Sequence, residues 1–209
     1  MSIIENSKWR YATKQFDATK KVSDADLATI KDAISLSATS YGLEAYKVLI
    51  VENPELREQL LPASWGQKQI TDASHLLVFC SFNEVSTEYI DGYVKLKSET
   101  QGIPLENLTG YGDFMKSTIG SFSAEATSTW NAKQTYISLA NAMAACAELK
   151  IDSCPMEGYD ATKYDQILGL SAKGLTAAVV LPIGYRSDED KTQHGKKVRK
   201  SFTDLFEVV

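Results

Sequence analysis

Apolar strand-like runs and amphipathic helical runs alternate along this chain of 209 residues, and their order limits the folds it can adopt. HLLVFCSF at 75–82 and LTAAVVLPIGY at 175–185 are short, apolar and rich in β-branched or aromatic residues, which predicts buried strands. Between them, 123–150 forms one long helical segment rich in Ala, Ser and Asn. The order is not the regular strand-helix repeat of a doubly wound sheet, and no G-x-G-x-x-G follows a strand. Helices and strands are therefore mixed in another way.

The remaining elements are predicted from capping residues and periodicity. Ser23 with Asp26 opens an amphipathic helix over 23–37, and Asn53 with Pro54 opens another over 53–61. Further helices are expected at 67–73, 86–97 and 161–168, and further strands at 46–52, near 151–154 and at the apolar tail 204–209.

The whole chain is expected to form a single domain, 1–209, with one excursion. The segment at about 98–122 is interrupted by Gly102, Pro104, Gly110 and Gly112. We expect this segment to leave the body of the domain as an excursion or lid.

Positive charge is concentrated near both ends of an acidic protein. The chain carries 22 Lys and Arg against 27 Asp and Glu, yet ten of the cations lie within 8–21 and 191–200, where Asp17 is the one acidic residue. Two interpretations stay open: the segments are solvated surfaces, or they meet in space to bind one anion, since the termini of a domain often lie close together. A nucleic-acid surface is disfavoured because the rest of the chain is strongly acidic.

The sequence offers few of the residues that several other types of site need. Cys80, Cys146 and Cys154 lie in apolar stretches without C-x-x-C spacing, so we expect buried thiols. His75 and His194 are the only histidines, which argues against a metal cluster or a Ser-His-Asp triad, and no metal is expected. The N-terminus shows no signal peptide, and no apolar run approaches the roughly 18 residues of a membrane span. We expect a cytoplasmic protein without a membrane or nucleic-acid partner.

Four segments in order resemble the oxygen-insensitive NAD(P)H-dependent nitroreductase family. They are RYATKQF, DASHLLVFC, AKQTYISLANAMAACAELKIDSCPMEGYD and GKKVRK. The resemblance implies an α+β fold with a central antiparallel or mixed sheet flanked by helices. It also implies a homodimer whose C-terminal tail adds a strand to the partner, with FMN as cofactor and NAD(P)H as reductant.

The resemblance assigns cofactor roles to residues of both charged ends. It places the FMN phosphate and ribityl chain against these residues: Arg10, Tyr11, Ala12, Lys14, Lys197 and Arg199. A phosphate monoester suits the planar fork of Arg and the point charge of Lys.

The same resemblance assigns residues to the flavin ring. Pro155, Glu157 and Gly158 match its P-x-E-G turn, which places backbone groups beside flavin N5. Gln67 and Gln69 stand near the positions that hydrogen-bond the pyrimidine end. Because the flavin carries the chemistry, no catalytic side chain is required of the protein.

The segment SATSYGLEAY at 37–46 departs from the family pattern. Thr39 and Ser40 still offer hydroxyls to the flavin, while Gly42 and Glu44 replace amides at the pocket rim. Candidate walls for a planar acceptor are Tyr41, Trp65, Phe114 and Phe122.

The resemblance predicts ping-pong transfer from NAD(P)H to a nitroaromatic, quinone or pterin-like acceptor. Two alternatives stay open at this stage. One is a flavin-binding sensor or storage protein without turnover, and the other is an interaction protein whose basic ends dock on an acidic partner.

Overall fold

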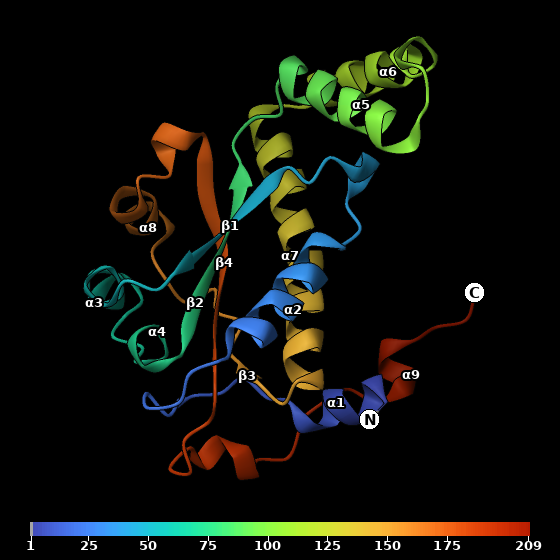
Figure 1. Ribbon diagram of the computed structural model, residues 1–209. Coiled ribbons are helices and arrows are strands. Elements are labelled where there is room, and N and C mark those ends of the chain that lie inside the picture. Colours follow the sequence, from blue (N-terminus) through green and yellow to red (C-terminus); the bar gives the residue numbers. More distant parts are fainter. Residues whose placement is uncertain (1) are drawn as a thin grey trace.

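The computed structural model describes residues 2–209 and is built around a four-stranded antiparallel sheet (Figure 1). The strands are β1 (Tyr46–Val51), β2 (His75–Phe82), β3 (Asp152–Ser153) and β4 (Leu175–Gly184), in the order β1-β2-β4-β3. Val48 lies opposite Phe79 in β2, and Val78 lies opposite Val180 in β4. An isolated parallel bridge from Ala12 to Ser153 extends the sheet. The expected α+β class with an antiparallel or mixed sheet is confirmed.

Helices cover both faces of the sheet. α2 (Asp24–Ser35) and α7 (Ala124–Glu148) pack on one face, while α3 (Pro54–Ala63), α4 (Gln69–Asp72) and α8 (Ala161–Leu168) lie on the other (Figure 1). Side chains alternate across β2, so Leu77 and Phe79 join the α2/α7 core while Leu76, Val78 and Cys80 join the opposite one. This two-sided burial explains why β2 is an unbroken apolar run.

The helix starts follow the predicted caps. Ser23 Oγ accepts from the Asp26 N–H at 3.1 Å, and Asn53 Oδ1 accepts from the Leu56 N–H at 2.9 Å. α8 has the expected bounds, Ala161–Leu168. Helix α1 (Ile3–Trp9) was not predicted, although Ser2 and Glu5 form a capping box at its start.

A pair of helices stands at the N-terminal end of α7, with a small core of its own (Figure 1). α5 (Thr87–Gln101) ends at Gly102 in a left-handed conformation, and α6 (Thr109–Gly120) follows. Gly110 and Gly112 therefore lie inside a helix, where the sequence suggested breaks. A Cβ on Gly112 would lie 3.3 Å from Val94 Cγ2, so this glycine permits α6 to approach α5 closely.

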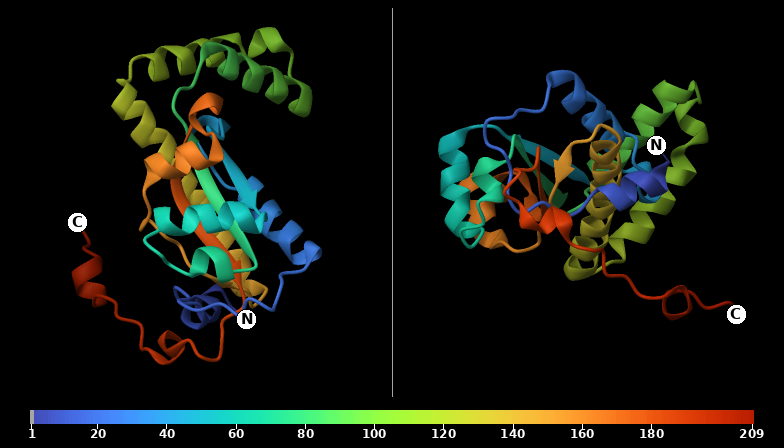
Figure 2. Two further views of the ribbon diagram at one scale, coloured as in Figure 1. Left: turned by 90° about the vertical axis from the view of Figure 1, so that its left-hand side faces the viewer. Right: turned by 90° about the horizontal axis from the view of Figure 1, so that it is seen from below.

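The chain ends in an exposed segment, residues 195–209, which we call the C-terminal arm. It leaves the body of the domain (Figure 2), and every residue in it is exposed. The strand expected at 204–209 is wrong for its first part, because the Ser201 side chain caps a short helix, α9 (Phe202–Leu205). Phe206–Val209 has no regular structure.

The short helical turns of the chain are η1 (Ser40–Gly42), η2 (Leu105–Asn107), η3 (Ser171–Lys173) and η4 (Lys191–His194). The three cysteines are free and buried, as expected. Among residues 2–209, no helix combines the length and apolar character that a membrane crossing needs. The same residues contain no grouping of three His, Cys, Asp or Glu side chains placed to hold a metal.

Candidate functional site

Three basic side chains from the two ends of the chain lie together, and we call Arg10, Lys197 and Arg199 the cation junction. Lys197 Nζ donates to the carbonyl oxygen of Arg10. Burial and the charge of Arg199 lower the pKa of Arg10, and burial, Arg10 and Arg199 lower the pKa of Lys197.

The cation junction has no counter-ion of its own. Among residues 2–209, no carboxylate forms an ion pair with any of its three members, and Arg10 Nε is buried without a hydrogen-bond partner. Like charges held together are unfavourable until an anion neutralises them. The geometry therefore suits an anionic group of a ligand.

Other basic residues of the two segments do not join the junction. Lys20 pairs with Asp17 at 3.1 Å, and the charges that lower the pKa of Arg10 and Lys197 do not include Lys8, Lys191, Lys196 or Lys200. Both interpretations of the charge pattern thus describe part of it: some cations are a solvated surface and three converge.

Asp190 and Arg186 hold the two ends of the chain together, and neither residue was identified from the sequence. Asp190 is 1% exposed and accepts from the Lys14 N–H at 2.8 Å and the Tyr11 hydroxyl at 2.9 Å. The Arg186 guanidinium lies between the rings of Trp9 and Tyr11, 4.5 and 4.6 Å from their centroids. Asp190 caps η4, which the sequence could have indicated, but its contacts with 11–15 are too distant along the chain for any local pattern.

Lys14 and Gln69 surround the buried thiol of Cys154. Burial raises the pKa of this thiol, while the charge of Lys14, a hydrogen bond with Gln69 and the charge of Arg10 pull it back down. Gln69 is itself 6% exposed. Cys154 therefore lies near the charges of Lys14 and Arg10 and near Gln69 at the start of α4.

The turn Pro155–Gly158 presents two free backbone donors. Met156 is held by exchange of hydrogen bonds with Val180, at 2.9 and 3.1 Å, and the Asp160 N–H donates to the Ala63 carbonyl at 2.8 Å. Within residues 2–209, neither the Glu157 nor the Gly158 N–H donates to a protein acceptor. The two N–H groups are available to an acceptor atom of a ligand or to water.

Gln67 supports this turn with its side chain. Its Nε2 donates to the carbonyls of Gly158 at 2.7 Å and Ser64 at 3.1 Å, which engages both amide hydrogens. A Cβ on Gly158 would lie 3.1 Å from both Gln67 Nε2 and Trp65 Cζ3, so only glycine fits without a shift. Trp65 is 71% exposed, which leaves its ring free to form one wall of a pocket.

Glu157 is tied to the middle of α7. Its carboxylate accepts a hydrogen bond from the Tyr136 hydroxyl. Burial and this hydrogen bond raise the pKa of Tyr136 to about 12, so the hydroxyl keeps its proton at neutral pH.

The other predicted pocket residues gather at the opposite end of α7. We call Tyr41, Phe114, Phe122 and Trp130 the aromatic end. Ring centroids are 6.1 Å apart for Tyr41 and Phe114, 6.3 Å for Tyr41 and Trp130, and 5.9 Å for Phe122 and Trp130.

Thr39 and Ser40 lie beside the aromatic end in a constrained loop. The Ser40 N–H donates to Gln134 Oε1 at 2.8 Å, and Thr39 Oγ1 accepts from the Glu44 N–H at 3.1 Å. Tyr41 and Glu44 have left-handed φ values of 60° and 47°, a costly conformation for residues with a side chain.

One chain keeps the aromatic end and the cation junction apart. Trp130 lies near the start of α7, whereas Asn6 of α1 donates to Glu148 at its far end. At about 1.5 Å per residue, these two points on α7 are roughly 27 Å apart. The structure thus brings together Arg10, Lys14, Gln69, Lys197 and Arg199, but places Thr39, Ser40, Tyr41, Phe114 and Phe122 elsewhere.

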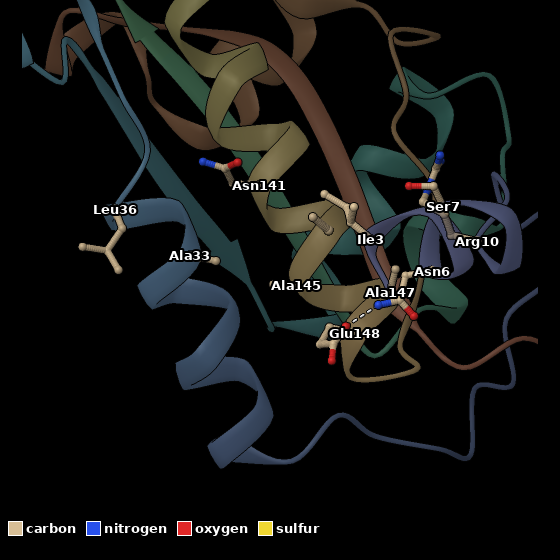
Figure 3. A pocket seen from close by; sticks show the side chains of 11 residues that line it. Ile3, Asn6, Ser7, Arg10, Ala33, Leu36, Asn141, Ala145, Ala147 and Glu148 are labelled. Carbon is tan, nitrogen blue, oxygen red and sulfur yellow. Dashed lines mark hydrogen bonds between the residues drawn. The ribbon is translucent and has the colours of Figure 1, made fainter. Parts of the chain in front are cut away.

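A groove of 440 Å³ runs between α1, α2 and α7 beside Arg10 (Figure 3). Alanines of α2 and α7 line it, and Ile3 and Leu36 are 70% and 84% exposed at its edge. Two of its polar side chains are already engaged, since Asn141 donates to Ser37 at 2.8 Å and Asn6 to Glu148. The groove therefore offers mainly apolar surface.

Known proteins resemble this chain over nearly its full length. The family model described as the nitroreductase family matches residues 7–185. A Staphylococcus epidermidis protein that carries the name NAD(P)H nitroreductase is 41% identical over 98% of this chain and 96% of its own. A Bacillus subtilis protein with the same name is 37% identical over 99% and 97%.

Solved structures share the fold. The structure of a protein described as a nitroreductase, in complex with FMN, from Exiguobacterium sibiricum superimposes with a TM-score of 0.88 over 100% of this chain and 98% of that one, at 17% identity. A Bacillus subtilis structure gives 0.88 over 99% and 98%, also at 17% identity. On the family match and the identities together, this chain belongs to the nitroreductase family.

Proposed function

We propose that this chain is an FMN-dependent NAD(P)H oxidoreductase that acts on planar nitroaromatic, quinone or pterin-like acceptors by a ping-pong mechanism. The observation that carries the proposal is the cation junction. Three cations without a carboxylate partner, one of them with an orphaned buried nitrogen, fit a phosphate monoester.

The described residues fit the rest of this cofactor as well. Arg10, Lys197 and Arg199 would hold the phosphate, and the segment Tyr11 to Lys14 would lie along the ribityl chain. The free N–H groups of Glu157 and Gly158 would donate to the ring edge, and Gln69 would face the pyrimidine end. Gln67, whose amide hydrogens are engaged, would hold the turn.

When bound, FMN would supply the redox chemistry, accepting a hydride from NAD(P)H and passing two electrons to the acceptor. The protein would bind and orient both reactants and keep the turn rigid. Trp65 would form one wall of the acceptor pocket, with Tyr41, Phe114 and Phe122 as the others.

We further propose a homodimer, because one chain holds only part of this site. The aromatic end and the Thr39–Ser40 loop would come from the second copy. The apolar groove of α1, α2 and α7 and the apolar side chains of the arm would be covered in it, with Phe202 and Phe206 being 83% and 62% exposed in one chain. The extended residues after Phe206 would then add a strand to the partner.

The test begins with the purified protein. We expect a yellow protein with a flavin spectrum, bleached by NADH or NADPH without oxygen and recoloured by menadione or a nitroaromatic. Protein that binds no added FMN would refute the cofactor assignment. Flavin that is bound but not bleached would instead support the alternative of a binding protein without turnover.

A further inference from the structure

One buried carboxylate stands where the two ends of the chain meet. Asp190 is 1% exposed, and four donors converge on it. Its Oδ2 accepts from the Lys14 N–H at 2.8 Å, the Gln15 N–H at 3.3 Å and the Tyr11 hydroxyl at 2.9 Å, while Oδ1 accepts from the Thr192 N–H at 2.9 Å. None of the ion pairs among residues 2–209 includes it. Its charge is thus satisfied by neutral donors, which a buried carboxylate requires.

These donors come from both segments that carry the cation junction. Lys14 and Tyr11 follow Arg10 closely in the N-terminal segment, and Thr192 lies in η4, a few residues before Lys197. The segments also run side by side next to this point, since the Ser187 N–H donates to the Gln15 carbonyl at 3.0 Å. One carboxylate therefore holds the N-terminal segment just after Arg10 and the C-terminal segment a few residues before Lys197.

Tyr11 contacts both Asp190 and a second group that holds the N-terminal segment in place, the guanidinium of Arg186. Its hydroxyl donates to Asp190, and its ring covers the guanidinium of Arg186, which pairs with the buried Asp152. Burial and the hydrogen bond with Asp190 raise the pKa of Tyr11, so the phenol remains a donor. Asp190 and Arg186 therefore hold the same short N-terminal segment in place.

The cation junction needs such a fastening because its members repel one another. Arg10 and Arg199 each lower the pKa of Lys197, and residues beyond η4 have no regular structure until α9. Without a fixed start, repulsion would favour conformations of the arm that separate the three charges.

We propose that Asp190 is the positioning residue of the cation junction, holding both chain ends so that Arg10, Lys197 and Arg199 face one phosphate. The inference rests on the proposed FMN site. It predicts an effect confined to the phosphate half of the ligand, because Asp190 contacts only the segments that carry the cations. A residue needed merely for folding would affect all flavins equally.

The experiment compares FMN with riboflavin, which lacks the phosphate, on deflavinated full-length protein. Dissociation constants come from flavin fluorescence. In Asp190→Asn we expect FMN to bind at least about tenfold more weakly, equal to about 1.4 kcal/mol, while riboflavin changes by less than about twofold. The matched control is Asp188→Asn, which removes one charge from an exposed neighbour and should leave both constants unchanged.

Each outcome decides the inference. An unchanged ratio of the two constants in Asp190→Asn overturns it, whether both ligands weaken together or neither does. If that variant does not fold, Tyr11→Phe removes a single donor and should raise the ratio of the FMN to the riboflavin dissociation constant by about threefold, and an unchanged ratio there has the same meaning. Wild-type protein that fails to bind FMN would instead refute the proposed function and leave no phosphate site to position.

Discussion

The two ends of helix α7 differ in whether one chain completes them. At the aromatic end, Tyr41, Phe114, Phe122 and Trp130 pack on one another, and the Tyr111 hydroxyl donates to the Tyr41 carbonyl at 3.2 Å. At the other end, the cation junction gathers three positive charges and supplies no anion. The aromatic side chains of the first region pack against residues of the same chain. The cations of the second region have no anionic partner among residues 2–209 and suit an anionic ligand. Burial and packing alone would not have indicated that the second region suits an anionic ligand.

Removing charge from the cation junction should have the largest effect. In Arg10→Ala with Arg199→Ala we expect FMN affinity to fall by at least about 100-fold, since each charge-assisted hydrogen bond contributes about 1.5 to 3 kcal/mol. Flavin content after purification and titration with FMN measure this. The control, Lys20→Ala with Lys191→Ala, removes two exposed cations from the same basic segments and should retain full binding. Equal loss in the control would mean that general charge, and not the junction, holds the cofactor.

Mixing two defective variants should restore activity if the two ends work in different copies. Arg10→Ala with Arg199→Ala keeps the aromatic end, and Tyr41→Ala with Phe114→Ala keeps the junction. A random mixture of refolded or coexpressed chains contains mixed dimers with one intact site, so we expect about a quarter of wild-type menadione reductase activity. Activity no greater than that of the separate variants would show that each chain builds its site alone.

Adding a methyl group to Gly158 in the Pro155–Gly158 turn should lower FMN affinity moderately. Gly158→Ala pushes a Cβ against Gln67 and Trp65, and overpacking of about 1 to 3 kcal/mol predicts FMN binding weaker by roughly tenfold. Gly110→Ala is the matched control, because its Cβ meets nothing within 4 Å in helix α6. That control should raise thermal stability by about 0.5 to 1 kcal/mol and leave FMN binding unchanged. Weakened binding in both variants would count against a specific role for the turn.

Lowering the pH should weaken the hydrogen bonds of Asp190 that hold the two chain ends together. We expect this effect to be the smallest of the four. Burial raises the pKa of Asp190, but hydrogen bonds from Lys14, Tyr11, Thr192 and Gln15 outweigh it, so the folded pKa lies below the ordinary value of about 3.9. A lowered pKa means that the carboxylate contributes stability above that ordinary value and loses it as the pH falls through the folded value. The gap in melting temperature between wild type and Asp190→Asn should therefore shrink as pH falls from 6 toward 2. A gap that stays constant would show that ionisation of Asp190 does not matter.

Local sequence patterns predicted most of the helices and strands. The caps at Ser23 and Asn53, the two-sided strand β2 and the bounds of α8 all follow from short-range chemistry, and the structure confirms them. The glycines of α6 misled, because Gly112 serves the packing of two helices and not a turn. The tail misled as well, since the cap at Ser201 outweighs the apolar run that follows it.

The candidate site was less accessible to such reasoning. Uneven charge indicated that the ends of the chain could meet, but not which three of ten cations would do so. Asp190 was not among the residues that the sequence singled out, and Gln67 was expected near the pyrimidine end of the flavin and not as a support of the turn. Their partners lie far away in the sequence, 176 residues between Asp190 and Lys14 and 91 between Gln67 and Gly158, so only the folded chain reveals their roles.

The exposed arm is a reason to expect that the lifetime of the protein depends on cofactor supply. Residues 195–209 make few contacts that would protect them, so proteases have an accessible target in the empty form. A ligand that binds only the folded state stabilises it in proportion to the logarithm of its concentration over the dissociation constant. We therefore expect cells short of riboflavin to hold less of this enzyme, because a larger share of it would lack FMN and be degraded faster.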